Sequence, residues 1–178
     1  MTTFIIIALV IVALIVFLMR SPKDFRVEKS ITINAPASVI FPHANDLKKF
    51  SVWNPWNKKD PNIKETFSGP NNGVGSHSDW IGNAQVGQGN MTITKSEPNS
   101  LVLMDLTFIK PFPGTNLTEF ILRPDGDKTV FTWAMSGKLC NIPKFMSLFI
   151  SMDKMMGSEF EKGLQTLKSI VEGQNRQA

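Results

Sequence analysis

The first twenty residues differ from the rest of the chain because they carry one unbroken apolar run. Residues 4–19 are all apolar, and thirteen of these sixteen are Ile, Leu, Val or Phe. As a helix, residues 2–19 would span about 27 Å, against about 30 Å for the hydrocarbon core of a bilayer. The run predicts a single transmembrane anchor over residues 1–20. A cleaved signal peptide, which lacks its usual small-residue site here, and a buried core helix are the alternatives.

Basic residues directly after the run indicate the orientation of this anchor. Arg20, Lys23, Arg26 and Lys29 follow it, whereas no charged side chain precedes it. The positive-inside rule then predicts a single-pass protein of the cell membrane with its domain on the cytoplasmic side. Residues 20–64 hold nine basic and four acidic residues, so the net charge of +4 is concentrated there. This surface either contacts anionic headgroups or is simply solvated.

After a short linker, residues 21–24, the pattern changes to strands. Apolar and polar residues alternate over 25–33, and Asn34-Ala-Pro36 then predicts a short helix, residues 37–44. A turn of helix is expected near 47–50, followed by a loop, residues 51–61. Six further strands separated by turn signals are expected over 63–67, 75–81, 88–97, 101–108, 117–122 and 129–138.

The last part of the domain changes to helical spacing. Apolar residues recur every three or four positions from about Pro143 to Glu172, which predicts one long amphipathic helix. Gly157 and Gly163 interrupt it, at about 1 kcal/mol each; each marks a close neighbour or ligand, or a tolerated weak point. The fold class is therefore α+β, with a curved antiparallel sheet of about seven strands around the C-terminal helix. The domain covers residues 25–173, and 174–178 form a tail.

Composition excludes several classes of site. Cys140 is the single cysteine, and His43 and His77 are the only histidines. Disulfide frameworks, thiolate zinc sites and multi-histidine metal sites are therefore not expected, and neither is a cofactor. The basic residues are not clustered with aromatic ones on one element, so nucleic-acid binding is not expected.

Several strings in the chain are similar to one superfamily. They are Ile-Asn-Ala-Pro-Ala-Ser-Val-Ile-Phe (33–41), Val-Trp-Asn-Pro-Trp (52–56), Thr-Trp-Ala-Met-Ser-Gly (132–137) and Phe-Glu-Lys-Gly-Leu (160–164). The chain resembles the START-like or SRPBCC superfamily, and within it the bacterial polyketide cyclase/dehydrase-like proteins, which often carry an N-terminal hydrophobic segment. The resemblance implies a helix-grip fold with a cavity for lipids or other hydrophobic molecules. Because members share no catalytic pattern, no catalytic residue is assigned.

The wall of this cavity is predicted from two patterns: which residues of each strand alternate onto the inward face, and which residues of the last helix lie on its apolar face. The predicted residues are Phe67, Trp80, Met91, Phe120, Phe131, Trp133 and Met135 from the sheet, with Met152, Met156 and Phe160 from the helix. Alternatively, these side chains fill a solid core. Polar positions with the same inward parity, which would orient a ligand, are Ser76, Ser78 and Thr118. Lys29 and Glu65 form either a buried pair or part of the rim.

The loop between residues 51 and 61 carries the most distinctive pair of aromatic residues. Trp53 and Trp56 flank Pro55. They are interpreted as a gate to the cavity, as a contact with the membrane interface, or as a structural plug. The favoured function is a membrane-anchored binding protein that holds a lipid or other hydrophobic small molecule, without catalysis. The alternatives are an enzyme of cyclase, dehydratase or hydrolase type on a hydrophobic substrate, and a membrane-tethered interaction or regulatory protein with a filled core.

Overall fold

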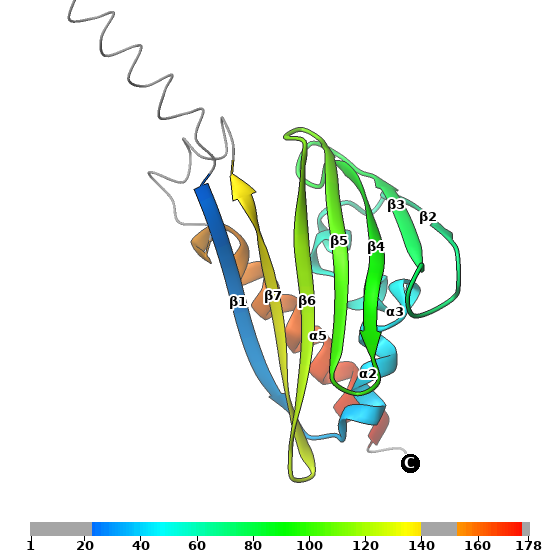
Figure 1. The fold of residues 1–178 in the computed structure, drawn as a ribbon, viewed down its shortest axis with the longest axis vertical. Helices are drawn as coiled ribbons and strands as arrows, with labels where there is room; N and C mark the ends of the chain where they lie inside the picture. Colours follow the sequence, from blue (N-terminus) through cyan, green and yellow to red (C-terminus); the bar gives the residue numbers. More distant parts are fainter. Residues whose placement is uncertain (1–22, 140–152, 176–178) are drawn as a thin grey trace, which may run out of the picture.

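A curved antiparallel sheet forms the body of the domain (Figure 1). The computed structural model describes residues 23–139 and 153–175. Within these ranges the sheet has seven strands in the order β1-β7-β6-β5-β4-β3-β2. Their bounds are β1 (Lys23–Ile33), β2 (Lys64–Ser68), β3 (His77–Ile81), β4 (Gln88–Glu97), β5 (Leu101–Lys110), β6 (Gly114–Asp125) and β7 (Lys128–Leu139). The predicted α+β class and number of strands are confirmed.

The order of the strands follows from hairpins and one closing pair. Strands β2 to β7 are consecutive antiparallel neighbours, and Gly126, at a φ of +59°, makes the turn between β6 and β7. Strand β1 then pairs with β7, from Lys23 opposite Leu139 to Ile33 opposite Thr129. The first and second strands in sequence therefore lie at opposite edges of the sheet.

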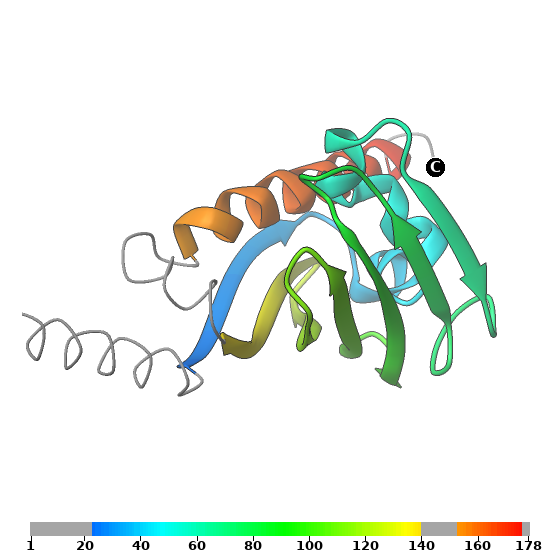
Figure 2. The ribbon, with the colours of Figure 1, turned by 90° about the horizontal axis from the view of Figure 1, so that it is seen from above.

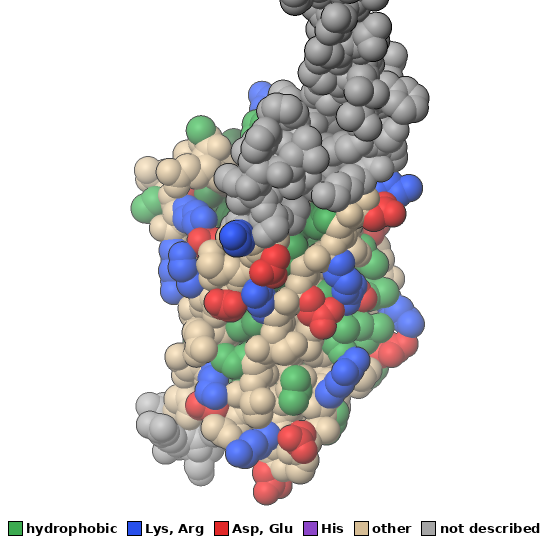
Figure 3. All heavy atoms as spheres, turned by 90° about the vertical axis from the view of Figure 1, so that its left-hand side faces the viewer, with side chains coloured by type: hydrophobic (Ala, Val, Ile, Leu, Met, Phe, Trp, Pro, Cys, Tyr) green, Lys and Arg blue, Asp and Glu red, His purple; other side chains and the backbone are tan. Residues whose placement is uncertain are grey.

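The edge formed by β1 is covered by interspersed charged side chains (Figure 3). Arg26 forms ion pairs with Glu28 and Glu119, and Lys29 contacts both Asp153 and Glu161 at 3.3 and 3.2 Å. Charges of both signs along an edge strand discourage pairing with another chain. Two of the basic residues near the start of the domain, Arg26 and Lys29, are therefore paired within it.

The connection from β1 to β2 is more helical than the sequence predicts. It contains α2 (Ala37–Ala44), α3 (Leu47–Trp53) and the 3-10 helix η1 (Pro55–Lys59), where the sequence predicts a loop over residues 51–61. The Asp46 carboxylate accepts hydrogen bonds from the backbone N–H groups of Lys48 and Lys49 and so caps α3. Short helices without a full period of apolar residues are difficult to recognise from spacing, because tertiary packing decides whether they form.

The C-terminal helix crosses the concave face of the sheet (Figure 2). A π-helical turn, η2 (Asp153–Gly157), leads into α5 (Ser158–Asn175). The helix buries Phe160, Leu164, Leu167 and Val171, whose spacing of three and four residues places them on one face. It ends three residues beyond the predicted Glu172, while the predicted start at Pro143 lies outside the described residues.

The N-terminal anchor predicted for residues 1–20 also lies outside the described residues. Across 23–139 and 153–175, no helix is long and apolar enough to cross a membrane. The linker predicted for residues 21–24 is shorter than expected, because Lys23 and Asp24 already pair with β7. The domain thus begins with a strand that starts at Lys23.

An aromatic cluster fills the concave face near the β6–β7 hairpin. Phe50 and Trp53 of α3 pack on Phe120, Phe131 and Trp133 of the sheet, with Phe50 and Trp53 ring centroids 4.7 Å apart. Trp53, Phe120 and Phe131 are fully buried. Helix α3 thus fills this part of the concave face, and Phe50 and Trp133 at the border of the cluster also line the cavity described below.

Candidate ligand cavity

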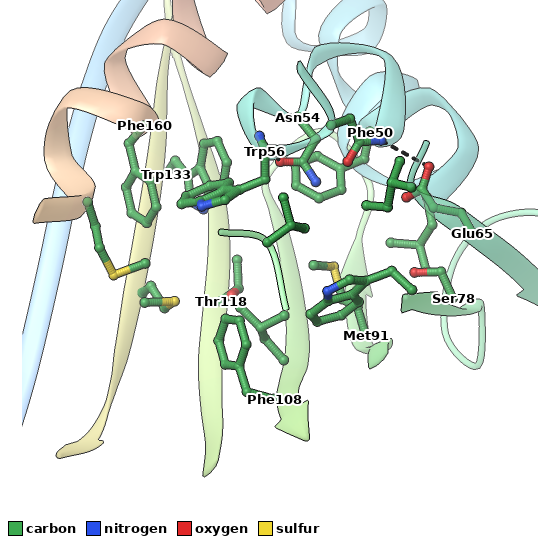
Figure 4. A pocket seen from close by; sticks show the side chains of 18 residues that line it. Phe50, Asn54, Trp56, Glu65, Ser78, Met91, Phe108, Thr118, Trp133 and Phe160 are labelled. Carbon is green, nitrogen blue, oxygen red and sulfur yellow. Dashed lines mark hydrogen bonds between the residues drawn. The ribbon is translucent and has the colours of Figure 1, made fainter. Parts of the chain in front are cut away.

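A cavity of about 100 Å³ lies between the concave face of the sheet and the helices (Figure 4). Its wall comes from strands β2 to β7, from α3 and η1, and from the start of the C-terminal helix. Many of the lining side chains are apolar or aromatic, and four of them, Trp56, Trp80, Phe108 and Met156, are only partly buried. The cavity wall is therefore mainly apolar and is not fully enclosed by the described residues.

Most of the side chains predicted to line a cavity are found in its wall. The structure brings together Trp80, Met91, Trp133, Met135, Met156 and Phe160. Their common feature is inward parity in a strand or a position on the buried face of the last helix. Met152 lies outside the described residues.

Three predicted residues lie elsewhere. Phe120 and Phe131 point inward as parity requires, but they are fully buried in the aromatic cluster under α3 and do not line the cavity. Phe67 lines a separate hollow of about 50 Å³, where the Lys48 ammonium lies 6.0 Å from its ring centroid. The alternation of residues along a strand correctly predicts that these side chains point to the concave face. It does not predict which helix covers each part of that face.

The two loop tryptophans have different positions. Trp53 ends α3, is fully buried, and donates a hydrogen bond from Nε1 to the backbone oxygen of His43 at 3.1 Å. It is a structural plug, so the gate and membrane-contact interpretations are wrong for this residue. Trp56 is half-buried in the cavity wall, with its ring 5.9 Å from Trp133 and 6.0 Å from Phe160.

Aromatic stacking fixes the shape of the wall on two sides. Trp133 and Phe160 stack face to face, with centroids 4.3 Å apart and an interplanar angle of 6°. Trp80 and Phe108 form an edge-to-face pair at 5.8 Å. The ring of Trp80 lies over Gly89, where a Cβ atom would approach it to 2.5 Å. A glycine inside a predicted strand is the sequence signal for this close approach.

A polar cluster at one end of the cavity consists of Ser51, Asn57 and Glu65. The Asn57 amide nitrogen donates to Glu65 Oε2 at 2.9 Å and to Ser51 Oγ at 2.7 Å, and the Ser51 hydroxyl also donates to Glu65 Oε2. The Asn57 Oδ1 atom is buried without a hydrogen-bond partner among the described residues. Asn57 is not predicted as a site residue, because the sequence places it in a loop rather than in η1.

Thr118 provides a second unpaired polar atom in the wall. It lies in the middle of β6 and is 1% exposed, and its hydroxyl has no hydrogen-bond partner in the described part of the chain. The side chain faces the cavity (Figure 4), as strand parity predicts. Ser78 also lines the cavity, whereas Ser76 lines the smaller hollow beside Phe67.

Lys29 and Glu65 do not form the buried pair considered from the sequence. They lie on opposite edge strands, and Lys29 is instead held by Glu161 and Asp153 at the start of the last helix. The hydrogen bond to Glu161, followed by that to Asp153, raises the pKa of Lys29 above its usual value. Lys29 therefore stays charged and joins β1 to the C-terminal helix.

A curved antiparallel sheet that grips a C-terminal helix around a small apolar cavity defines a helix-grip protein of the START-like type. The family model described as polyketide cyclase / dehydrase and lipid transport matches residues 24–172. This chain belongs to that family. No curated protein matches it.

Solved structures share the fold at low sequence identity. Mll3558 from Rhizobium loti is 16% identical with a TM-score of 0.61, over 85% of this chain and 99% of the other. TTHA0849 from Thermus thermophilus is 17% identical with a TM-score of 0.60, over 84% and 98%. The Aha1 dimer from Colwellia psychrerythraea is 20% identical with a TM-score of 0.58, over 83% and 96%. These similarities establish the fold alone.

Proposed function

We propose that this protein binds a hydrophobic small molecule, or one end of a lipid, in the cavity between sheet and helix. The observation that carries the proposal is an apolar wall interrupted by the unpaired, buried hydroxyl of Thr118. A buried polar group without a partner costs about 1–3 kcal/mol. A wall that retains such a group is typical of a site in which a ligand supplies the partner.

The cavity volume limits what fits inside. A cavity of about 100 Å³ holds a single ring or a short chain, so a larger molecule must extend out of the cavity. Burying ~150 Å² of ligand at about 25 cal/mol per Å² gives about 4 kcal/mol, which corresponds to a Kd near 1 mM. A physiological ligand therefore needs further affinity from polar contacts or from its protruding part.

Native mass spectrometry tests this proposal. The full chain, released from membranes in a mild detergent, is expected to carry a bound lipid or apolar metabolite. Ser78→Phe directs a ring into the cavity from β3 and should abolish that mass, since Ser78 is buried in the wall. Asp105→Phe, on the exposed face of β5, is the matched control and should retain it. Equal occupancy in both variants would contradict the proposal.

We also propose that residues 4–19 anchor the domain to the cytoplasmic face of a membrane. The apolar run supports this, and so does the end of the sheet at which β1 begins. The pairing of the strands places one exposed apolar group and one exposed basic group at that end of the sheet. The apolar residues are Ile81, Ile109 and Phe112, and the basic residues are Lys64, Lys110 and Lys138. Apolar and basic side chains together suit an anionic membrane surface.

Fractionation tests the anchor. The full chain is expected to remain in the membrane pellet after carbonate extraction, and deletion of residues 2–20 should release it. Protease added to sealed spheroplasts should leave the domain intact if it faces the cytoplasm. Release of the full chain by carbonate, or digestion in intact spheroplasts, would overturn the anchor or its orientation respectively.

Binding is better supported than catalysis. Among the described wall residues, Glu65 is the single ionisable side chain, and Ser51 and Asn57 already donate to its Oε2. Cyclisation or dehydration requires proton donors and acceptors placed around the reacting atoms. The described wall supplies one such group at one end, which suits orientation of a bound molecule.

A further inference from the structure

The described cavity wall contains one acidic residue and no basic residue. Glu65 is negative, whereas the wall residues that the structure describes include no Lys, Arg or His. No ion pair between described residues involves Glu65. A carboxylate facing an apolar cavity without a cationic neighbour favours a ligand that brings a proton donor or a positive charge to it.

The orientation of the Asn57 amide adds to this asymmetry. Its nitrogen faces three acceptors, namely Glu65 Oε2, Ser51 Oγ and the backbone oxygen of Ser51. Because only the NH2 group can donate to these oxygens, the position of Oδ1 is fixed on the other side of the amide. Oδ1 is buried and unpaired among the described residues. The hydrogen bonds thus use the donors of this cluster internally, and the cluster has no donor left for an anionic ligand.

We propose that the ligand presents a hydrogen-bond-donating head, a hydroxyl or a protonated amine, to the Glu65 carboxylate, with its apolar body along Trp80, Trp133 and Phe160. This inference rests on the proposed function of the cavity. It excludes carboxylate and phosphate heads as the group bound at this end, because two anions would meet in an apolar surrounding that lacks a described counter-ion. Fatty acids and phosphorylated lipids would therefore not bind head first.

Four probes with one apolar body separate the contributions of the head. Ethylbenzene, 2-phenylethanol, 2-phenylethylamine and phenylacetate share a phenyl ring, and their side chains differ in the polar group. The full chain in phosphatidylcholine nanodiscs is titrated with each, and the indole N–H signals in nitrogen-15 spectra report binding. Trp56, Trp80 and Trp133 line the cavity, while Trp53 serves as a buried reference. The alcohol and the amine should bind roughly tenfold more tightly than ethylbenzene, and phenylacetate should bind most weakly.

Glu65→Gln tests the role of the charge. It keeps the acceptor oxygen and the shape but removes the negative charge, so the affinity for the amine should fall about tenfold while that for the alcohol changes by less than about threefold. Asp105→Asn, an exposed carboxylate on the outward face of β5, is the matched control and should change neither affinity. The order of the four probes on the unmodified protein does not depend on how well the variants fold.

The outcomes separate the two proposals. Equal affinities for ethylbenzene, the alcohol and phenylacetate, or tightest binding of phenylacetate, would overturn the donor-head inference and leave cavity binding intact. The donor-head inference also fails if Glu65→Gln leaves the amine affinity unchanged. If neither 2-phenylethanol nor 2-phenylethylamine, the two water-soluble probes expected to bind most tightly, shifts the signals of Trp56, Trp80 or Trp133 at roughly 50-fold above 1 mM, cavity binding itself is wrong.

Discussion

The buried hydroxyl of Thr118 is expected to lower the stability of the ligand-free protein while serving ligand binding. Its buried hydroxyl has no partner among the described residues, whereas the hydroxyl of Thr129, equally buried, donates to the backbone oxygen of Ala35 at 2.8 Å. The two threonines lie on neighbouring strands with the same buried character. They therefore form a pair of equally buried threonines, one of which lines the cavity without a hydrogen bond while the other is hydrogen-bonded outside the cavity wall.

We expect opposite effects from the same substitution at these two positions. Thr118→Val should raise the free energy of unfolding of the ligand-free protein by about 1 kcal/mol, because it removes an unpaired polar atom. Thr129→Val should lower it by about 1–2 kcal/mol, since Ala35 loses its donor. Urea unfolding of the full chain followed by tryptophan fluorescence measures both. A destabilised Thr118→Val would show that its hydroxyl is satisfied without a ligand.

Single residues were predictable where one local rule decides their position. Strand alternation places Trp80, Met91 and Thr118 on the inward face, and all three line the cavity. Asn57 was not predictable, since its role depends on η1 and on a partner, Glu65, in another element. For Trp53 the structural plug, one of its three interpretations, agrees with its full burial. The sequence could not select it, because nothing in the neighbouring residues shows that α3 turns this side chain into the core.

At the scale of elements, Gly163 marks a place where the last helix packs closely against the rest of the domain. A Cβ atom there would approach Trp133 to 2.8 Å and Pro55 to 3.0 Å. The sequence left open whether this glycine marks a close neighbour or a weak point, and the structure shows a close neighbour. Gly157 is similar, since its Cβ would approach Lys29 to 2.6 Å.

The two ends of α5 offer a matched pair of glycines. Gly163→Ala should lower the free energy of unfolding by about 1–3 kcal/mol despite the better helix propensity of alanine, because the ring of Trp133 and the backbone beneath it must move. Gly173→Ala should raise it by about 0.5–1 kcal/mol, as nothing lies within 4 Å of its Cβ position. Thermal melts of both variants measure the difference, and similar shifts would contradict the close contact.

Glu159 joins the last helix to η1, the element that carries Trp56 and Asn57. Its carboxylate contacts Lys59 of η1 at 3.2 Å and Lys162 at 2.8 Å. Burial raises the pKa of Glu159, but the hydrogen bonds and charges of Lys162 and Lys59 outweigh it and hold the pKa below the usual 4.5. A lowered carboxyl pKa stabilises the fold above about pH 4.5, and that contribution is lost as the pH falls below it.

This link predicts a pH-dependent stability. Between about pH 6 and pH 3 the unmodified protein should lose more stability than Glu159→Gln, which has no charge to lose. Asp105→Asn is the control, because Asp105 has no ion pair among the described residues, and should follow the unmodified protein. The urea midpoint of each protein is measured at several pH values. If the midpoint falls by the same amount with pH in all three proteins, the ion pair between Glu159 and Lys59 does not stabilise the fold.

For the whole molecule, ligand binding should appear as added stability. At 100 times its Kd, a ligand of the native state contributes about 2.7 kcal/mol, which for a chain of this size raises Tm by roughly 5–10 °C. We expect this shift with 2-phenylethanol on the unmodified protein. Ser78→Phe should show none, because its ring occupies the cavity. A similar shift in both proteins would mean that the alcohol binds elsewhere.

The overall architecture was predictable because it depends on repeated, local signals. Alternation over many strands, glycine and proline turns, and the helical spacing of Phe160, Leu164, Leu167 and Val171 together specify a sheet wrapped around a helix. The size and position of the cavity were not predictable. They depend on how far α3 extends under the sheet, which leaves a small chamber where the sequence suggests a long wall.

The position of the cavity opening bears on exchange kinetics. Strand β1 begins at the same end of the sheet at which Trp80 and Phe108, two partly buried residues of the cavity wall, adjoin the exposed Ile81 and Ile109. If the proposed anchor holds the domain at the membrane by this end, a guest would travel between acyl chains and protein without crossing bulk water. Its rate of uptake would then follow its lateral concentration in the leaflet and not its aqueous solubility, so even a nearly insoluble compound would be captured quickly.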